Sequence, residues 1–164
     1  METSNSPLMA APLDIDLNTV DTSMPLIADG SIANFVFDKV VLKDTKTPGV
    51  SMLSLDLKTL TPTKSQDGGD LGAGTHVFHN LVLAPSGKGT WEMVARNVGA
   101  VVQNAGVKLE GTGAQAQIDY LKNNSAILQG AQIGGKVKVV PEGVDKNGKA
   151  YRAKNEIVVF MKVQ

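Results

Sequence analysis

The residues of this chain best suited to chemistry are cationic, and they gather near its carboxy-terminal end. Between Gly135 and Gln164 the sequence holds seven basic and three acidic side chains, a local balance of +4 in a chain whose net charge is zero. The acidic counterweight lies in the first 34 residues, which hold five acidic and no basic side chains. Lysine and arginine neutralise phosphates, so this distribution predicts a protein that binds a polyanion.

Within this basic segment, Lys136 and Lys138 lie two residues apart in an expected strand. Their ammonium groups therefore leave the same face, while Val137 faces the core. Tyr151 could stack on a base, and Arg152 could stack or contact a phosphate with its forked donors. The expected DNA-binding residues are Lys39, Lys43, Lys58, Lys136, Lys138, Tyr151, Arg152 and Lys154. A solvated, lysine-rich sheet edge that discourages strand pairing is an alternative of about equal weight.

Catalytic and metal chemistry find little support in the sequence. His76 and His79 are the only histidines, and three residues apart on a strand they point to opposite faces, so they cannot hold one ion together. Ser86–Thr90 lacks the first glycine of a phosphate-binding loop. Lys149 stands where a calcium loop beginning at Asp145 needs an oxygen ligand. We expect no catalytic residue, no metal site and no cofactor, and therefore no enzyme.

The elements that must position the cationic residues are mostly strands. We expect strands over residues 31–44, 50–61, 75–85, 136–140 and 156–163, because these runs are rich in β-branched residues or alternate in polarity. The clearest alternation places Leu53, Leu55 and Leu57 on one face. A hairpin turn is expected at Asn147-Gly148, and the glycine-rich loop 61–74 is a candidate functional loop.

Helical spacing appears only between the third and fourth expected strands. It predicts a helix over residues 91–105, capped by Thr90 and ended by Gly106, with Trp91 and the valines packed on the sheet. A second, weaker helix is expected over residues 114–128, with Ile118, Leu121 and Leu128 inward. The seven aromatic residues are expected to be mostly core.

This order of elements defines the expected fold class, which is mainly β (α+β). We expect an OB-like, five-stranded, partly open barrel with a helix between strands three and four. Residues 29–164 would form this domain, and residues 1–28, interrupted by three prolines, would form an extended acidic arm.

Several segments also resemble a phage family. They include the runs F-V-F-D-K-V-V-L-K-D, L-S-L-D-L-K and G-T-H-V-F-H-N-L-V-L, and the ending G-K-A-Y-R-A-K-N-E-I-V-V-F. With these runs the chain, from about residue 28 to 163, resembles the single-strand-binding, recombination-associated OB-fold proteins of phage replication modules. That family is largely catalogued as a domain of unknown function. The resemblance implies an OB-like barrel without a catalytic centre that binds single-stranded DNA during replication or recombination.

Two function classes remain open at this stage. The first is non-enzymatic binding of single-stranded DNA, with phage replication or recombination proteins as further partners. The second is a structural virion or assembly protein, a capsid-decorating or tail component that uses its arm for subunit contacts. Self-association is left open for both. The chain contains no cysteine and no long apolar run, so we expect no membrane partner and a cytoplasmic location, in an infected host cell if a phage encodes it.

Overall fold

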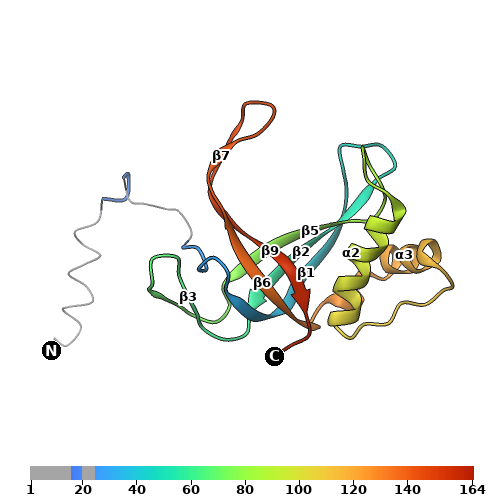
Figure 1. Ribbon diagram of the computed structural model, residues 1–164, viewed down its shortest axis with the longest axis horizontal. Helices are drawn as coiled ribbons and strands as arrows, with labels where there is room; N and C mark the ends of the chain where they lie inside the picture. The colour runs from blue at the N-terminus through green and yellow to red at the C-terminus, as the bar shows by residue number, and fades with distance from the viewer. Residues whose placement is uncertain (1–15, 20–24) are drawn as a thin grey trace.

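A five-stranded antiparallel sheet with the strand order β5-β2-β1-β6-β9 forms the body of the molecule (Figure 1). The computed structural model describes residues 16–19 and 25–164. The strands of the large sheet are β1 (Ile32–Asp44), β2 (Ser51–Thr59), β5 (His76–Val82), β6 (Gln132–Val140) and β9 (Lys154–Met161). The sheet is not closed into a barrel, and β5 and β9 are its two edges.

Two small ribbons extend from this sheet. The first pairs β3 (Thr63–Lys64) with β4 (Asp70–Leu71) inside the loop that the sequence marks as a candidate functional loop. The second pairs β7 (Gly143–Val144) with β8 (Ala150–Tyr151) around the predicted turn at Asn147-Gly148. Figure 1 shows the β7–β8 hairpin rising from the sheet on the same side as the turn between β1 and β2.

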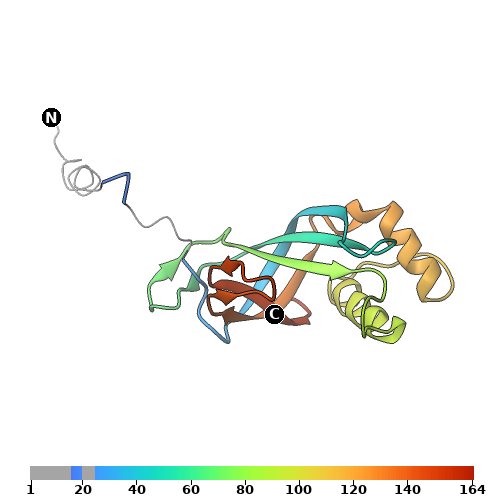
Figure 2. The same ribbon diagram turned by 90° about the horizontal axis from the view of Figure 1, so that it is seen from above.

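The helices follow β5 in the chain and lie together at one end of the sheet (Figures 1 and 2). They are α2 (Trp91–Asn104) and α3 (Ala114–Asn123), and a short 3₁₀ helix, η1 (Ser125–Leu128), follows. The predicted N-cap is confirmed, because the Thr90 hydroxyl accepts a hydrogen bond of 3.2 Å from the Met93 amide. Gly106 adopts the expected left-handed conformation after α2, with a φ of +71°.

The core lies between the inner face of the sheet and the helices. The alternation predicted for β2 is confirmed, since Leu53, Leu55 and Leu57 are fully buried. Val98 and Val101 of α2 pack into the same cluster. Ile118, Leu121 and Leu128 are buried as expected.

The aromatic residues correct one expectation. Only Phe35 and Phe37 are buried, whereas Phe78, Trp91 and Tyr151 are exposed. Trp91 was expected to pack on the sheet but is 44% exposed. Trp91 is the first residue of α2, and the buried face of the helix begins only at Val94 and continues with Val98 and Val101.

A bulge in β1 at Asp38 shapes the sheet. The register of β1 against β2 shifts between Phe37 and Lys39, so Asp38 and Lys39 both lie outside the core. Bulges bend strands and increase their twist. The bent sheet brings its two edges close, and the rings of His79 on β5 and Phe160 on β9 meet edge to face at 4.9 Å.

The amino-terminal segment enters the domain through one buried residue. The arm expected over residues 1–28 falls mostly outside the described residues. Its described end contributes Ile27, which is fully buried and bridges Ser65. The side-chain amide of Asn155 on β9 binds both backbone groups of Ile27, accepting from its N–H at 2.8 Å and donating to its carbonyl at 2.9 Å.

Candidate nucleic-acid interface

The side of β1, β2 and β5 that faces away from the core, called the outer face here, carries four transverse rows of side chains. Strand register sets these rows, because residues directly opposite in an antiparallel pair point to the same side. The rows are Val36–Lys58–His76, Lys39–Asp56–Phe78, Val41–Ser54–Asn80 and Lys43–Met52–Val82.

Phe78 is the most prominent apolar group on the outer face. The alternation of β5 buries Val77 and Leu81 and leaves the Phe78 side chain 63% exposed. Its ring stacks beside that of His76, with centroids 6.2 Å apart and planes at 18°. The two ring planes are nearly parallel, and an exposed aromatic ring is a surface on which a nucleobase can stack.

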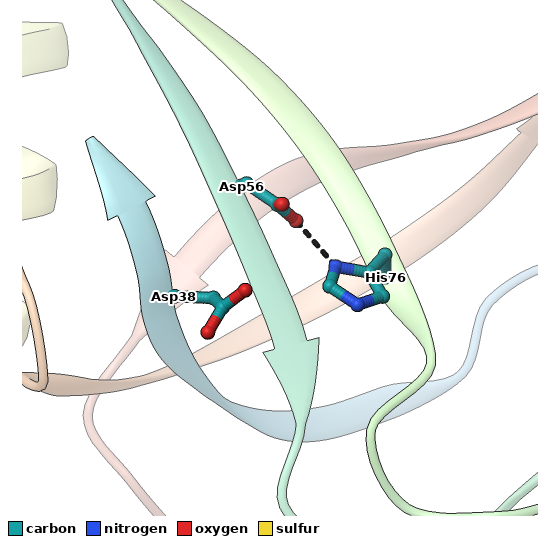
Figure 3. Close-up of side chains that lie close together, drawn as sticks. All are labelled: Asp38, Asp56 and His76. Carbon is teal, nitrogen blue, oxygen red and sulfur yellow. Dashed lines mark hydrogen bonds and ion pairs between the residues drawn. The ribbon is translucent and has the colours of Figure 1, made fainter. Parts of the chain in front are cut away.

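Three lysines lie on β1 and β2 beside this surface, and part of their charge is compensated. Lys39 and Lys43 are exposed on β1, and neither forms an ion pair with any other described residue. The Lys58 ammonium lies 3.2 Å from Asp38 Oδ1. His76 Nδ1 lies 2.6 Å from Asp56 Oδ1 (Figure 3). The outer face therefore keeps a small positive excess near the aromatic pair.

The other predicted site residues form a separate group. Lys136 and Lys138 are exposed on β6, as their spacing predicts, and Lys138 lies opposite Glu156 of β9. Lys154 Nζ is 3.4 Å from Glu156. Strand β6 pairs with residues 32–36 of β1, and Lys136 lies opposite Ile32. The β6 lysines therefore point to the same side of the sheet as Val36, but they lie beside the start of β1, away from Lys39 and Lys43.

The remaining two predicted site residues belong to the β7–β8 hairpin and its end, outside the large sheet. Tyr151 ends β8 with 43% of its side chain exposed, and the exposed Arg152 follows it. The β7–β8 hairpin that carries them rises on the same side as the β1–β2 turn next to Lys43 (Figure 1). Tyr151 and Arg152 would contact a nucleic-acid strand on the outer face only if that strand also reached this projecting hairpin.

A cleft of about 470 Å³ separates the two edges of the sheet. Pro25 and Leu26 contribute to its lining, together with residues 75–80 of the β5 segment and 153–157 of the β9 segment. His79 faces inward, opposite the buried Leu55. Burial lowers the pKa of its imidazole, and the charge of Glu156 opposes this effect. The predicted placement of the two histidines on opposite faces is thus confirmed.

The sheet also assembles a cluster that the sequence analysis missed. Asp38, Asp56 and His76 come from three neighbouring strands, and their potential ligand atoms all lie within 4.8 Å of one another (Figure 3). Exposed Phe78 was missed as well. The sequence could have identified Phe78 as exposed, because His76, Phe78 and Asn80 alternate with the apolar Val77 and Leu81. The cluster could not be identified in this way, because it depends on register between strands.

No protein-family model matches the chain, and no curated protein sequence matches it. Among the described residues, no helix combines the length and apolar character needed to cross a membrane. The function is therefore inferred from the arrangement of side chains.

Proposed function

We propose that this protein binds single-stranded DNA, without catalysis, on the outer face of β1, β2 and β5. The observation that carries this proposal is the exposed ring of Phe78 beside His76, on a face that also carries three lysines: Lys39 in the row of Phe78, Lys58 in the row of His76 and Lys43 two rows further along. Stacking of bases on aromatic side chains and neutralisation of phosphates are the two contributions that such proteins combine.

The proposal favours a single strand over a duplex. In a duplex the bases are already stacked on one another and only the backbone is on the outside. An aromatic ring exposed on a sheet can stack with bases that are free to leave their own stack, as those of a single strand are. Phe78 projects from the middle of β5, so a strand lying across the sheet could place a base on it.

An OB-like identity is part of the same proposal. OB-folds bind oligonucleotides on their second and third strands, between the loop joining strands one and two and the loop joining strands four and five. In the large sheet, the second and third strands in chain order are β2 and β5. The corresponding loops are the β1–β2 turn and the β7–β8 hairpin, which rise on the same side (Figure 1). These correspondences support the relationship to the phage family.

The charge of the face implies modest affinity. For single strands, log Kobs falls with log salt by about 0.7 for each phosphate contact. Three contacts from Lys39, Lys43 and Lys58 predict a slope of roughly −2. A hairpin contribution from Arg152 would make the slope steeper by a similar increment.

A salt titration of labelled oligo-dT tests this function. The double variant Lys39→Met/Lys43→Met should bind more weakly, and its slope should be shallower by about 1.4. A matched control, Lys88→Met/Lys108→Met, removes the same charge from exposed lysines outside the large sheet and should keep the wild-type slope.

The mass in solution, measured alongside, separates the competing class. Salt-sensitive binding that the first double variant weakens supports the proposal. Absence of binding, with ordered assembly that depends on protein concentration, would contradict it and favour the structural virion or assembly role.

A further inference from the structure

Three potential metal ligands converge on the outer face from three strands. Asp38 lies on β1, Asp56 on β2 and His76 on β5 (Figure 3). The bulge in β1 adds Asp38 to the outer face next to the row that contains Asp56. Strand register and this bulge together bring close residues that lie 18 and 20 positions apart in the sequence.

The donor set is that of a divalent transition metal. One imidazole nitrogen with two carboxylate oxygens is a combination that Zn²⁺ accepts, at bond lengths of about 2.0–2.2 Å. Around such an ion neighbouring donors lie roughly 3–3.5 Å apart. The Asp56 and His76 donor atoms are 2.6 Å apart, and all donors lie within 4.8 Å. The donor atoms are therefore near coordination spacing, and the side chains of Asp38, Asp56 and His76 are 30%, 17% and 37% exposed.

The cluster already contacts a positively charged side chain, that of Lys58. The ammonium of Lys58 lies 3.2 Å from Asp38 Oδ1. This contact to one of the three ligands means that the position beside Asp38 already accommodates a positive charge. The side chain of Lys58 is 40% exposed, so it can swing into solvent when another cation takes its place.

We propose that Asp38, Asp56 and His76 bind a divalent transition-metal ion, which displaces the Lys58 ammonium from Asp38. Three protein ligands leave a fourth position for a water or for a phosphate oxygen of a nucleic acid. Coordination of a phosphate oxygen rests on the proposed function. Metal binding would make the outer face more positive and would free Lys58 to contact a phosphate.

The first experiment measures zinc binding by the full-length chain without DNA, in competition with a chromophoric chelator. The wild-type protein should bind one equivalent. His76→Ala and Asp38→Asn should each weaken binding by roughly tenfold or more, since even the outer partners of metal ligands contribute 10–100-fold. Asp44→Asn removes an exposed carboxylate from the same strand outside the cluster and should leave the affinity unchanged.

Lys58→Met gives the sharpest result, because its expected effect has the opposite sign. Loss of one positive charge about 5 Å from a divalent ion should strengthen zinc binding by roughly tenfold. If the wild-type protein fails to bind zinc, if Asp44→Asn weakens binding as much as Asp38→Asn, or if Lys58→Met weakens it, the metal site is refuted. Thermal melts of each variant establish that these surface changes leave the fold intact.

A second experiment separates this inference from the proposed function. Zinc should raise the affinity of the wild-type protein for oligo-dT and leave that of Asp38→Asn unchanged. Zinc binding without any oligo-dT binding would support the metal site and refute the DNA proposal. Oligo-dT binding by a protein that does not bind zinc would support the DNA proposal and refute the metal site.

Discussion

Replacement of Phe78 by alanine is the most direct test of how the outer face would bind a single strand. The change removes the exposed ring and leaves every charged side chain in place. Stacking of one base on an aromatic side chain is worth about 1–3 kcal/mol, which corresponds to roughly 5- to 150-fold in Kd. Because the ring is 63% exposed, most of its apolar surface contacts solvent, and the variant should remain folded.

The assay is fluorescence anisotropy of labelled oligo-dT at several salt concentrations. Affinity should fall at every salt concentration while the slope against log salt stays the same, because no phosphate contact is lost. Phe78→Trp should retain binding. Trp91→Ala is the matched control, since it removes an aromatic side chain that is 44% exposed and lies at the start of α2, outside the outer face.

Two results would refute this reasoning. In the first, Phe78→Ala binds oligo-dT as well as the wild-type protein does, or loses no more affinity than Trp91→Ala. In the second, the salt slope changes with the affinity, which would mean that the ring acts by positioning lysines rather than by stacking.

Three further predictions concern stability and use urea unfolding. Ile27→Ala should lower the free energy of unfolding by about 2–5 kcal/mol, while Leu17→Ala, at a side chain that is 86% exposed, should not; equal effects would contradict the anchoring role of Ile27. Burial lowers the pKa of His79 below 6.5, so the unfolded chain takes up its proton first as the pH falls. Stability should therefore decrease as the pH falls from about 6.5 through the folded-state pKa and be unaffected by this group above that range; His79→Leu should lack this component, and an unchanged profile would count against it. Gly134→Ala would place a Cβ 2.7 Å from the Lys162 carbonyl oxygen and should cost about 1–3 kcal/mol, whereas Gly72→Ala, with nothing within 4 Å, should be neutral; similar losses for both would rule out crowding as the cause.

Local sequence signals predicted much of the architecture. Alternation identified the inner face of β2, and the Thr90 and Gly106 signals located the ends of α2. These features depend on neighbouring residues, and the sequence contains that information directly. The prediction that Trp91 packs on the sheet was wrong. Helical periodicity identifies the apolar face of a helix, but it does not show how far along the helix that face is covered.

The candidate site was less accessible from the sequence, because it depends on which strands are adjacent and in what register. Lys136 and Lys138 were correctly assigned to one exposed face, yet Lys136 lies opposite Ile32, seven residues along β1 from Lys39. The Asp38–Asp56–His76 cluster requires both the β1–β2–β5 pairing and the bulge at Asp38. Neither is encoded in the spacing of those residues.

The amide clamp between Asn155 and Ile27 has a consequence for biosynthesis. It joins residues 128 positions apart, and contacts of such long sequence separation form late. Strands β1, β2 and β5 can pair once residues 32–82 have left the ribosome, but β1 receives its second neighbour only when β6 emerges. Any sheet that β1, β2 and β5 form before then lacks β6 and β9, and Ile27 gains its Asn155 partner only after β9 has been made.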